Sequence, residues 1–136
     1  MKDVLISIKP VFVNKILIEE KKFEFRKKNF SSKVRNIVIY SSSPKQKMVG
    51  YFNYTGVISG TPKEVWDKCK NHSGIDESDY FNYFRDKSVA FAIKIEKIET
   101  FRVEINPKEI WNKFVPPQSF YYLKEGEFDE VFCNLV

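Results

Sequence analysis

The strongest constraint on how this chain can fold is the alternation of apolar residues between positions 89 and 96. Val89, Phe91, Ile93 and Ile95 alternate there with alanines and charged residues. Successive side chains of a β-strand point to opposite faces of its sheet, so a period of two predicts a strand rather than a helix. The 13 Phe and 7 Tyr residues favour the same conclusion, because aromatic side chains pack well on a pleated sheet.

Other strand patterns in the chain are separated by short helical ones. The expected strands span residues 4–8, 23–26, 37–40 and 48–59, and glycines within the last one indicate a bulge or a sharp bend. The expected helices run from Pro10 to about residue 20, begin after Thr61, span residues 77–85, and begin after Asn106. Short helices between strands, with no Gly-rich phosphate loop, predict an α+β fold based on a small mixed β-barrel. They exclude a doubly wound parallel sheet.

The length and residue types limit the class of protein further. At 136 residues the chain has the size of a single domain, which we place at residues 1–136. No apolar run approaches the roughly 20 residues that cross a bilayer, and the first residues lack a secretory signal. Cys69, Cys133 and His72 do not have metal-ligand spacing. We therefore expect a cytoplasmic protein with free thiols, no membrane segment, no metal and no cofactor.

Charge is distributed unevenly along the chain. Residues 1–47 contain 12 Lys and Arg against 4 Asp and Glu, whereas residues 48–136 contain 11 against 14. A basic part beside a mildly acidic one can steer a polyanion, although solvated surface lysines give the same count. Charge alone therefore leaves both interpretations open.

A resemblance to a known family begins at residues 19–26, which read Glu-Glu-Lys-Lys-Phe-Glu-Phe-Arg. This segment resembles the Gly-x-Lys-x-x-Glu-x-Arg motif that follows the first helix of ASCH domains, members of the PUA-like superfamily. Lys21, Glu24 and Arg26 match the motif, and Glu19 replaces its glycine. Further segments resemble the family in the same order, namely residues 7–10, residues 39–44, the strand around Gly50, and residues 116–120.

The resemblance implies a PUA-like barrel of five to six strands with a cleft beside the first helix. ASCH domains are proposed to bind RNA, often as regulatory modules, and some small bacterial relatives are amidohydrolases acting on acetylated cytidine. We accordingly expect a cleft that recognises a nucleotide or a modified base of RNA or another single-stranded nucleic acid.

The chemistry of the motif residues suits such a ligand. Glu24 and Arg26 are two apart on a predicted strand, so they share one face, while Phe23 and Phe25 face the core. The Arg fork suits a phosphate or a base edge, Glu accepts hydrogen bonds from amino groups, and tyrosines can stack on an unpaired base. The predicted nucleic-acid-binding residues are Lys9, Lys21, Glu24, Arg26, Tyr40, Ser41, Ser42, Ser43, Gln118, Ser119, Tyr121 and Tyr122.

Two alternatives to nucleic-acid binding stay open. The amidohydrolase relatives have a threonine at the position of Glu24, and this chain lacks that hydroxyl, although Lys21 and Glu24 could still act as an acid/base pair. The sequence therefore favours binding over catalysis. The other alternative is a protein-interaction module of a phage or mobile element, with the acidic C-terminal residues 125–130 and surface aromatics in the contact.

Overall fold

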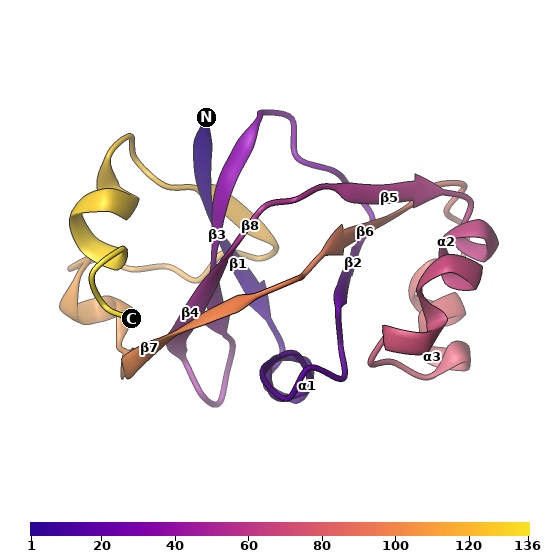
Figure 1. Ribbon diagram of the computed structural model, residues 1–136, viewed down its shortest axis with the longest axis horizontal. Coiled ribbons are helices and arrows are strands. Elements are labelled where there is room, and N and C mark those ends of the chain that lie inside the picture. Colours follow the sequence, from indigo (N-terminus) through magenta and orange to yellow (C-terminus); the bar gives the residue numbers. More distant parts are fainter.

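The computed structural model describes residues 1–136 and contains two β-sheets with helices at their margins (Figure 1). The α+β class expected from the sequence is confirmed. The strands pair in one sheet of five and one of three, with the orders β7-β4-β3-β1-β8 and β2-β6-β5. A single closed barrel of five to six strands is therefore not confirmed.

The five-stranded sheet supplies the largest core. Its strands are β1 (Lys2–Ile8), β3 (Val34–Ser41), β4 (Lys47–Asn53), β7 (Ile98–Ile105) and β8 (Phe120–Tyr122). Central strands β1 and β3 are parallel and are covered on both faces, which explains their continuous apolar runs. Val4 packs in the cluster on one face and its neighbour Leu5 in the cluster on the other.

The three-stranded sheet consists of β2 (Phe23–Arg26), β6 (Ala90–Lys94) and β5 (Val57–Gly60). The predicted strand at residues 23–26 is confirmed with the same bounds, and the one predicted at residues 89–96 is confirmed as the shorter β6. The strand expected at residues 48–59, with a bulge or bend at its glycines, is divided into β4 and β5. The irregularity at the glycines is present, but the two parts belong to different sheets, which corrects the prediction of one strand. Gly56 lies in the break with a φ of 134°, a conformation that favours glycine.

The helices lie at the margins of the sheets, and the four helices expected from the sequence are all present, with the last one reduced to a single short turn. They are α1 (Pro10–Leu17), α2 (Pro62–Cys69) and α3 (Glu77–Tyr83), with short helical turns at Lys70–His72, Pro107–Glu109 and Phe128–Phe132. A capping box forms the start of α2, which the sequence places after Thr61, since Thr61 and Glu64 exchange hydrogen bonds of 3.1 and 2.9 Å. None of the helices has the length and hydrophobicity that crossing a membrane requires.

The connections between the strands bring β2 and α3, which are far apart in the sequence, close to each other. The crossover from β1 to β3 contains α1 and β2, and β2 lies between the five-stranded sheet and helices α2 and α3 (Figure 1). Phe25 on β2 packs edge-on against Tyr80 of α3, with ring centroids 5.0 Å apart. The polar side chains of β2 therefore lie between the end of β1 and the segment that leads into α3.

Candidate functional site

The turn from α1 into β2 forms although the motif glycine is absent. Glu19 occupies the glycine position with a φ of 64°, in the left-handed region that side chains adopt at a cost. The backbone N–H groups of Glu20 and Lys21 donate to the Lys15 carbonyl at 2.9 and 3.1 Å, which ends the helix. The local geometry that a glycine would supply is therefore retained by a strained glutamate.

Lys21 follows this turn and is buried, with only 2% of its surface exposed. Its ammonium group donates a hydrogen bond of 2.7 Å to the carbonyl of Ser73 and lies 5.0 and 4.7 Å from the ring centroids of Phe12 and Phe25. The stem lies against Gly74, where an added Cβ atom would come within 2.6 Å of the Lys21 Cβ. Burial lowers the pKa of Lys21 from 10.5 to about 8, against the opposing attraction of Glu24.

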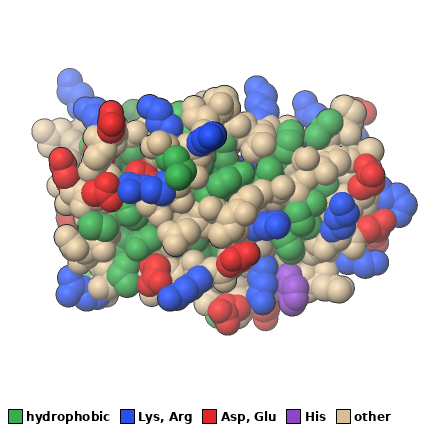
Figure 2. Space-filling view, turned by 45° about the horizontal axis from the view of Figure 1, so that its top comes forward, with side chains coloured by type: hydrophobic (Ala, Val, Ile, Leu, Met, Phe, Trp, Pro, Cys, Tyr) green, Lys and Arg blue, Asp and Glu red, His purple; other side chains and the backbone are tan.

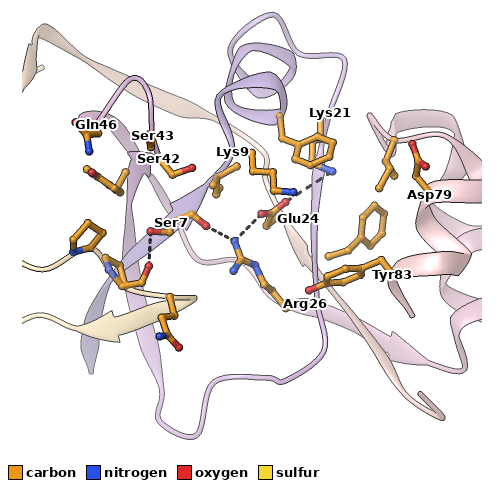
Figure 3. A pocket seen from close by; sticks show the side chains of 18 of the residues that line it. Ser7, Lys9, Lys21, Glu24, Arg26, Ser42, Ser43, Gln46, Asp79 and Tyr83 are labelled. Atoms are coloured by element: carbon orange, nitrogen blue, oxygen red, sulfur yellow. Dashed lines mark hydrogen bonds and ion pairs between the residues drawn. The ribbon is translucent and has the colours of Figure 1, made fainter. Parts of the chain in front are cut away.

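Glu24 lies between the two cations of the motif. One carboxylate oxygen accepts a 2.8 Å ion pair from Arg26, and the other lies 3.9 Å from the Lys21 nitrogen (Figure 3). The predicted shared face of Glu24 and Arg26 is confirmed by this contact. Lys21, Glu24 and Arg26 are together called the motif cluster below.

Arg26 is held by the protein itself. It donates to the carbonyl of Ser7 at 2.6 Å and to the hydroxyl of Ser119 at 3.1 Å, in addition to its pair with Glu24. Its Nε atom is buried and has no hydrogen-bond partner. The guanidinium therefore ties β2 to the end of β1 and to the 116–120 segment, and only part of its fork remains for a ligand.

A cavity of about 730 Å³ opens over the motif cluster. The turn after β3 forms one side and α3 forms the other, with the motif cluster between them (Figure 3). Its lining residues are Ser7, Ile8, Lys9, Phe12, Lys21, Glu24, Phe25, Arg26, Tyr40, Ser42, Ser43, Gln46, Ile75, Asp79, Asn82, Tyr83, Pro116, Pro117 and Gln118.

Most of the residues predicted for the site meet at this cavity. Besides the motif cluster, those in the lining are Lys9, Tyr40, Ser42, Ser43 and Gln118. Ser119 is outside the lining but contacts Arg26.

Three predicted residues lie elsewhere, which corrects the sequence interpretation. Ser41 is buried as the last residue of β3. Tyr121 packs in the core cluster on the other side of the five-stranded sheet. The Tyr122 hydroxyl accepts hydrogen bonds from the backbone of Ser31 and Ser32 at 3.1 and 3.2 Å, so this ring braces a loop instead of facing the cavity.

The sequence interpretation missed one whole wall of the cavity. This wall is formed by α3 and the residues just before it, namely Ile75, Asp79, Asn82 and Tyr83. The helix itself was expected, but no local pattern indicates that its outer face lies opposite the motif cluster. Ser7 and Gln46 were missed as well.

Charges near the cavity and on the surface are mixed. Figure 2 shows basic and acidic side chains interspersed over one face of the molecule. The uneven distribution along the sequence therefore does not become a single basic face in this view. No group of three His, Cys, Asp or Glu side chains is placed to hold a metal ion.

Comparison with known proteins identifies the family. The model of the ASCH domain matches residues 6–99, which include the motif cluster and the cavity walls up to Tyr83. The chain belongs to the ASCH domain family, within the PUA-like proteins.

Particular relatives extend the likeness over almost the whole chain. An ASCH domain-containing ribonuclease of Zymomonas mobilis is 26% identical over 129 residues, covering 93% of this chain and 87% of the relative. The crystal structure of ASCH from Zymomonas mobilis superimposes with a TM-score of 0.85 and 26% identity, covering 95% of this chain and 92% of that one. The mixed α+β fold is thus that of known ASCH structures.

A second kind of relative is larger than this chain. The large ribosomal subunit protein uL22 of Ureaplasma parvum is 33% identical over 107 residues, covering 77% of this chain. This chain spans about a third of the length of that relative, because the match covers 33% of it.

Proposed function

We propose that the chain binds RNA and holds one unpaired nucleotide in the cavity over the motif cluster. The observation that supports this most directly is the buried Lys21 ammonium at the base of a 730 Å³ cavity, paired incompletely with a carboxylate 3.9 Å away. Pockets of about 300–1,000 Å³ commonly hold small ligands of nucleotide size. A buried cation with spare hydrogen-bonding capacity suits an anionic or carbonyl-bearing ligand.

The sheet-side wall suits the sugar and phosphate of that nucleotide. This wall has an ammonium group, two hydroxyls and an amide, and it has no carboxylate. The groups belong to Lys9, Ser42, Ser43 and Gln46. These groups are frequent partners of phosphate and ribose oxygens. The relationship to a protein described as an ASCH domain-containing ribonuclease supports RNA as the nucleic acid.

An electrophoretic titration against mixed-sequence single-stranded RNA at low and moderate salt tests the binding. We expect Arg26→Ala to weaken binding at least tenfold, because loss of the guanidinium leaves the Glu24 carboxylate uncompensated at the cavity. Arg85→Ala and Lys2→Ala remove exposed charges outside the lining and should change affinity less than twofold. Absence of binding at low salt would overturn the proposal, since phosphate contacts are strongest there.

RNA cleavage is a second candidate, and the pKa of Lys21 favours it. An amine with a pKa of about 8 is neutral often enough near neutral pH to accept a proton. In this reaction Lys21 takes the proton of a ribose 2′-hydroxyl, whose oxygen bonds to the adjacent phosphorus. The bond from phosphorus to O5′ breaks, and O5′ takes up a proton from the ammonium or from water. The related ribonuclease makes this chemistry the first to test.

Cleavage and binding are separated by a fluorogenic RNA and its copy with a single 2′-deoxy nucleotide at each cleavage position. We expect turnover of the RNA with a rising limb near pH 8, no turnover of the deoxy copy, and similar affinity for both. Lys21→Met should lose turnover while Lys68→Met, which changes an exposed lysine outside the cavity, keeps it. Equal turnover in the two variants would show that Lys21 takes no part.

The hydrolysis of acetylated cytidine stays a prediction without support from the geometry. The amidohydrolase relatives use a threonine where this chain has Glu24, and Glu24 is engaged with Arg26 at 2.8 Å. Turnover of acetylated cytidine that disappears in Lys21→Ala would establish this activity. The protein-interaction module likewise stays a prediction, to be tested by a pull-down insensitive to nuclease.

A further inference from the structure

The two walls of the cavity differ in chemistry. On the sheet side, the β3–β4 turn and the 116–118 segment provide hydroxyl and amide groups and no carboxylate. On the opposite side, α3 provides Asp79, the single carboxylate of the lining besides Glu24 (Figure 3). A nucleotide in the cavity therefore meets different partners at its two ends.

Asp79 and Asn82 are available to a ligand. They are three residues apart on α3, so their side chains project on the same face of the helix. Both are exposed, and Asp79 is in none of the ion pairs of the structure. One offers only hydrogen-bond acceptors, and the other offers a donor and an acceptor.

Electrostatics fixes the direction in which a nucleotide lies. A phosphate beside Asp79 would be repelled by a carboxylate that no cation neutralises, whereas Lys9 and the serines on the other wall attract it. The base is left for the α3 wall. Apolar surface for the face of a base is present there, since Ile75 and Tyr83 also line the cavity.

We propose that Asp79 and Asn82 read the edge of the base and make the cavity prefer adenine and cytosine over uracil. This inference rests on the proposed RNA binding and adds a base preference to it. Adenine and cytosine present an exocyclic amino donor beside a ring-nitrogen acceptor, which match the Asp79 carboxylate and the Asn82 amide. In the same placement uracil turns its O4 carbonyl toward the Asp79 carboxylate with no hydrogen between them, and its N3–H is left to the oxygen of the Asn82 amide, so that one of the two contacts is lost.

The size of the preference follows from the exposure of these side chains. A base that leaves a polar group of the site unpaired loses most when that group is buried. Asp79 and Asn82 are exposed, so water replaces part of the lost interaction. We expect a preference of about tenfold, which corresponds to about 1.4 kcal/mol.

Fluorescence anisotropy with labelled hexamers of adenylate, cytidylate and uridylate tests the inference on the full chain. The expected result is binding of the first two about tenfold tighter than the third. Asp79→Asn should reduce the ratio to less than threefold, mainly through tighter binding of uridylate, because an amide can donate to the uracil carbonyl. Glu77→Gln is the matched control, since it removes one negative charge from the same helix outside the cavity lining and should keep the ratio.

The outcomes separate this inference from the proposed function. Binding of all three hexamers with equal affinity would overturn the base reading and leave RNA binding intact. A uniform loss in Asp79→Asn with an unchanged ratio would also overturn it. Failure of every hexamer to bind would overturn both.

Discussion

Two charged clusters lie near opposite ends of β1 and are made of similar residue types. Near the start of the strand, the buried carboxylate of Asp3 accepts four hydrogen bonds of 2.8 to 3.2 Å from Arg35 and Asn36. Near its end, the carbonyl of Ser7 accepts from Arg26 of the motif cluster. We call the first group, completed by the Arg35–Asp129 ion pair of 3.1 Å, the Asp3 cluster.

The two clusters differ in what is left unpaired. In the Asp3 cluster the carboxylate is fully engaged, and none of its residues lines the large cavity. In the motif cluster Lys21 has spare donors, the Nε atom of Arg26 has no partner, and the cavity lies above. A closed network holds strands together, whereas an open one retains capacity for a ligand. Charge and burial alone therefore do not distinguish a structural site from a binding site.

The largest expected change in the free energy of unfolding is in the Asp3 cluster. Asp3→Ala should lower the free energy of unfolding by about 3 kcal/mol, because it leaves buried donors of Asn36 and one face of Arg35 without an acceptor. Urea denaturation followed by circular dichroism measures this. Asp129→Ala removes a carboxylate whose side chain is 58% exposed and should cost less than about 0.5 kcal/mol. The distinction between a structural Asp3 cluster and a ligand-binding motif cluster would be contradicted if Asp3→Ala weakened RNA binding of the folded protein as much as Arg26→Ala does.

In the motif cluster, a substitution is expected to raise the free energy of unfolding instead of lowering it. A lysine pKa lowered to about 8 means that the folded state disfavours the charged form. The shift corresponds to roughly 3 kcal/mol, and loss of the hydrogen bond to Ser73 offsets about 1 kcal/mol of it. Lys21→Met should therefore raise the free energy of unfolding at pH 7 by about 2 kcal/mol while weakening RNA binding.

The pH dependence provides the control for this variant. Below about pH 8 both folded and unfolded chains carry the Lys21 proton, and above 10.5 both have lost it. Between these values only the unfolded chain is protonated, so the contribution of Lys21 to stability rises with pH. The excess stability of Lys21→Met over the wild type should shrink across that interval. An excess that stays constant would contradict the assignment.

An effect of similar size and opposite sign is expected at the glycine that packs against Lys21. Gly74→Ala should lower the free energy of unfolding by about 2 kcal/mol, because it combines backbone strain at a φ of 65° with a Cβ contact to the Lys21 stem. Gly126→Ala introduces strain at a φ of 81° without a close contact, and should cost about 1 kcal/mol. Titration of RNA should show weaker binding in the first variant alone. If the two substitutions lower the free energy of unfolding equally, the Lys21 side chain moves away from the added Cβ atom at no cost.

The smallest effect concerns the turn before the motif cluster. Glu19→Gly should raise the free energy of unfolding by about 0.5–1 kcal/mol, because glycine adopts a φ of 64° without the Cβ penalty. Thermal unfolding by scanning calorimetry measures the gain. Glu20→Gly is the matched control and should lower stability, since Glu20 is outside the positive-φ region. A loss of stability in Glu19→Gly would show that its side chain contributes more than its strain costs.

Much of the local structure could be predicted because the signals are short-range. The alternation in β2 places Glu24 and Arg26 on one face, and this pair forms as expected. The Thr61 cap and Pro62 define the start of α2. In contrast, β7 gave no clear signal, because along this edge strand only Phe101 is buried.

Most strands and helices and the α+β class follow from the spacing of neighbouring residues in the sequence. Lys21, Glu24 and Arg26 are indicated as a group by their resemblance to a family motif, and spacing adds the shared face of Glu24 and Arg26. Tertiary packing separates β4 and β5 into two sheets and places α3 opposite the motif cluster, and neither arrangement has a local signal. It also buries Lys21 against Ser73, 52 residues away. The physical reason is that burial and pKa depend on which distant segments pack together, and local periodicity contains no record of that packing.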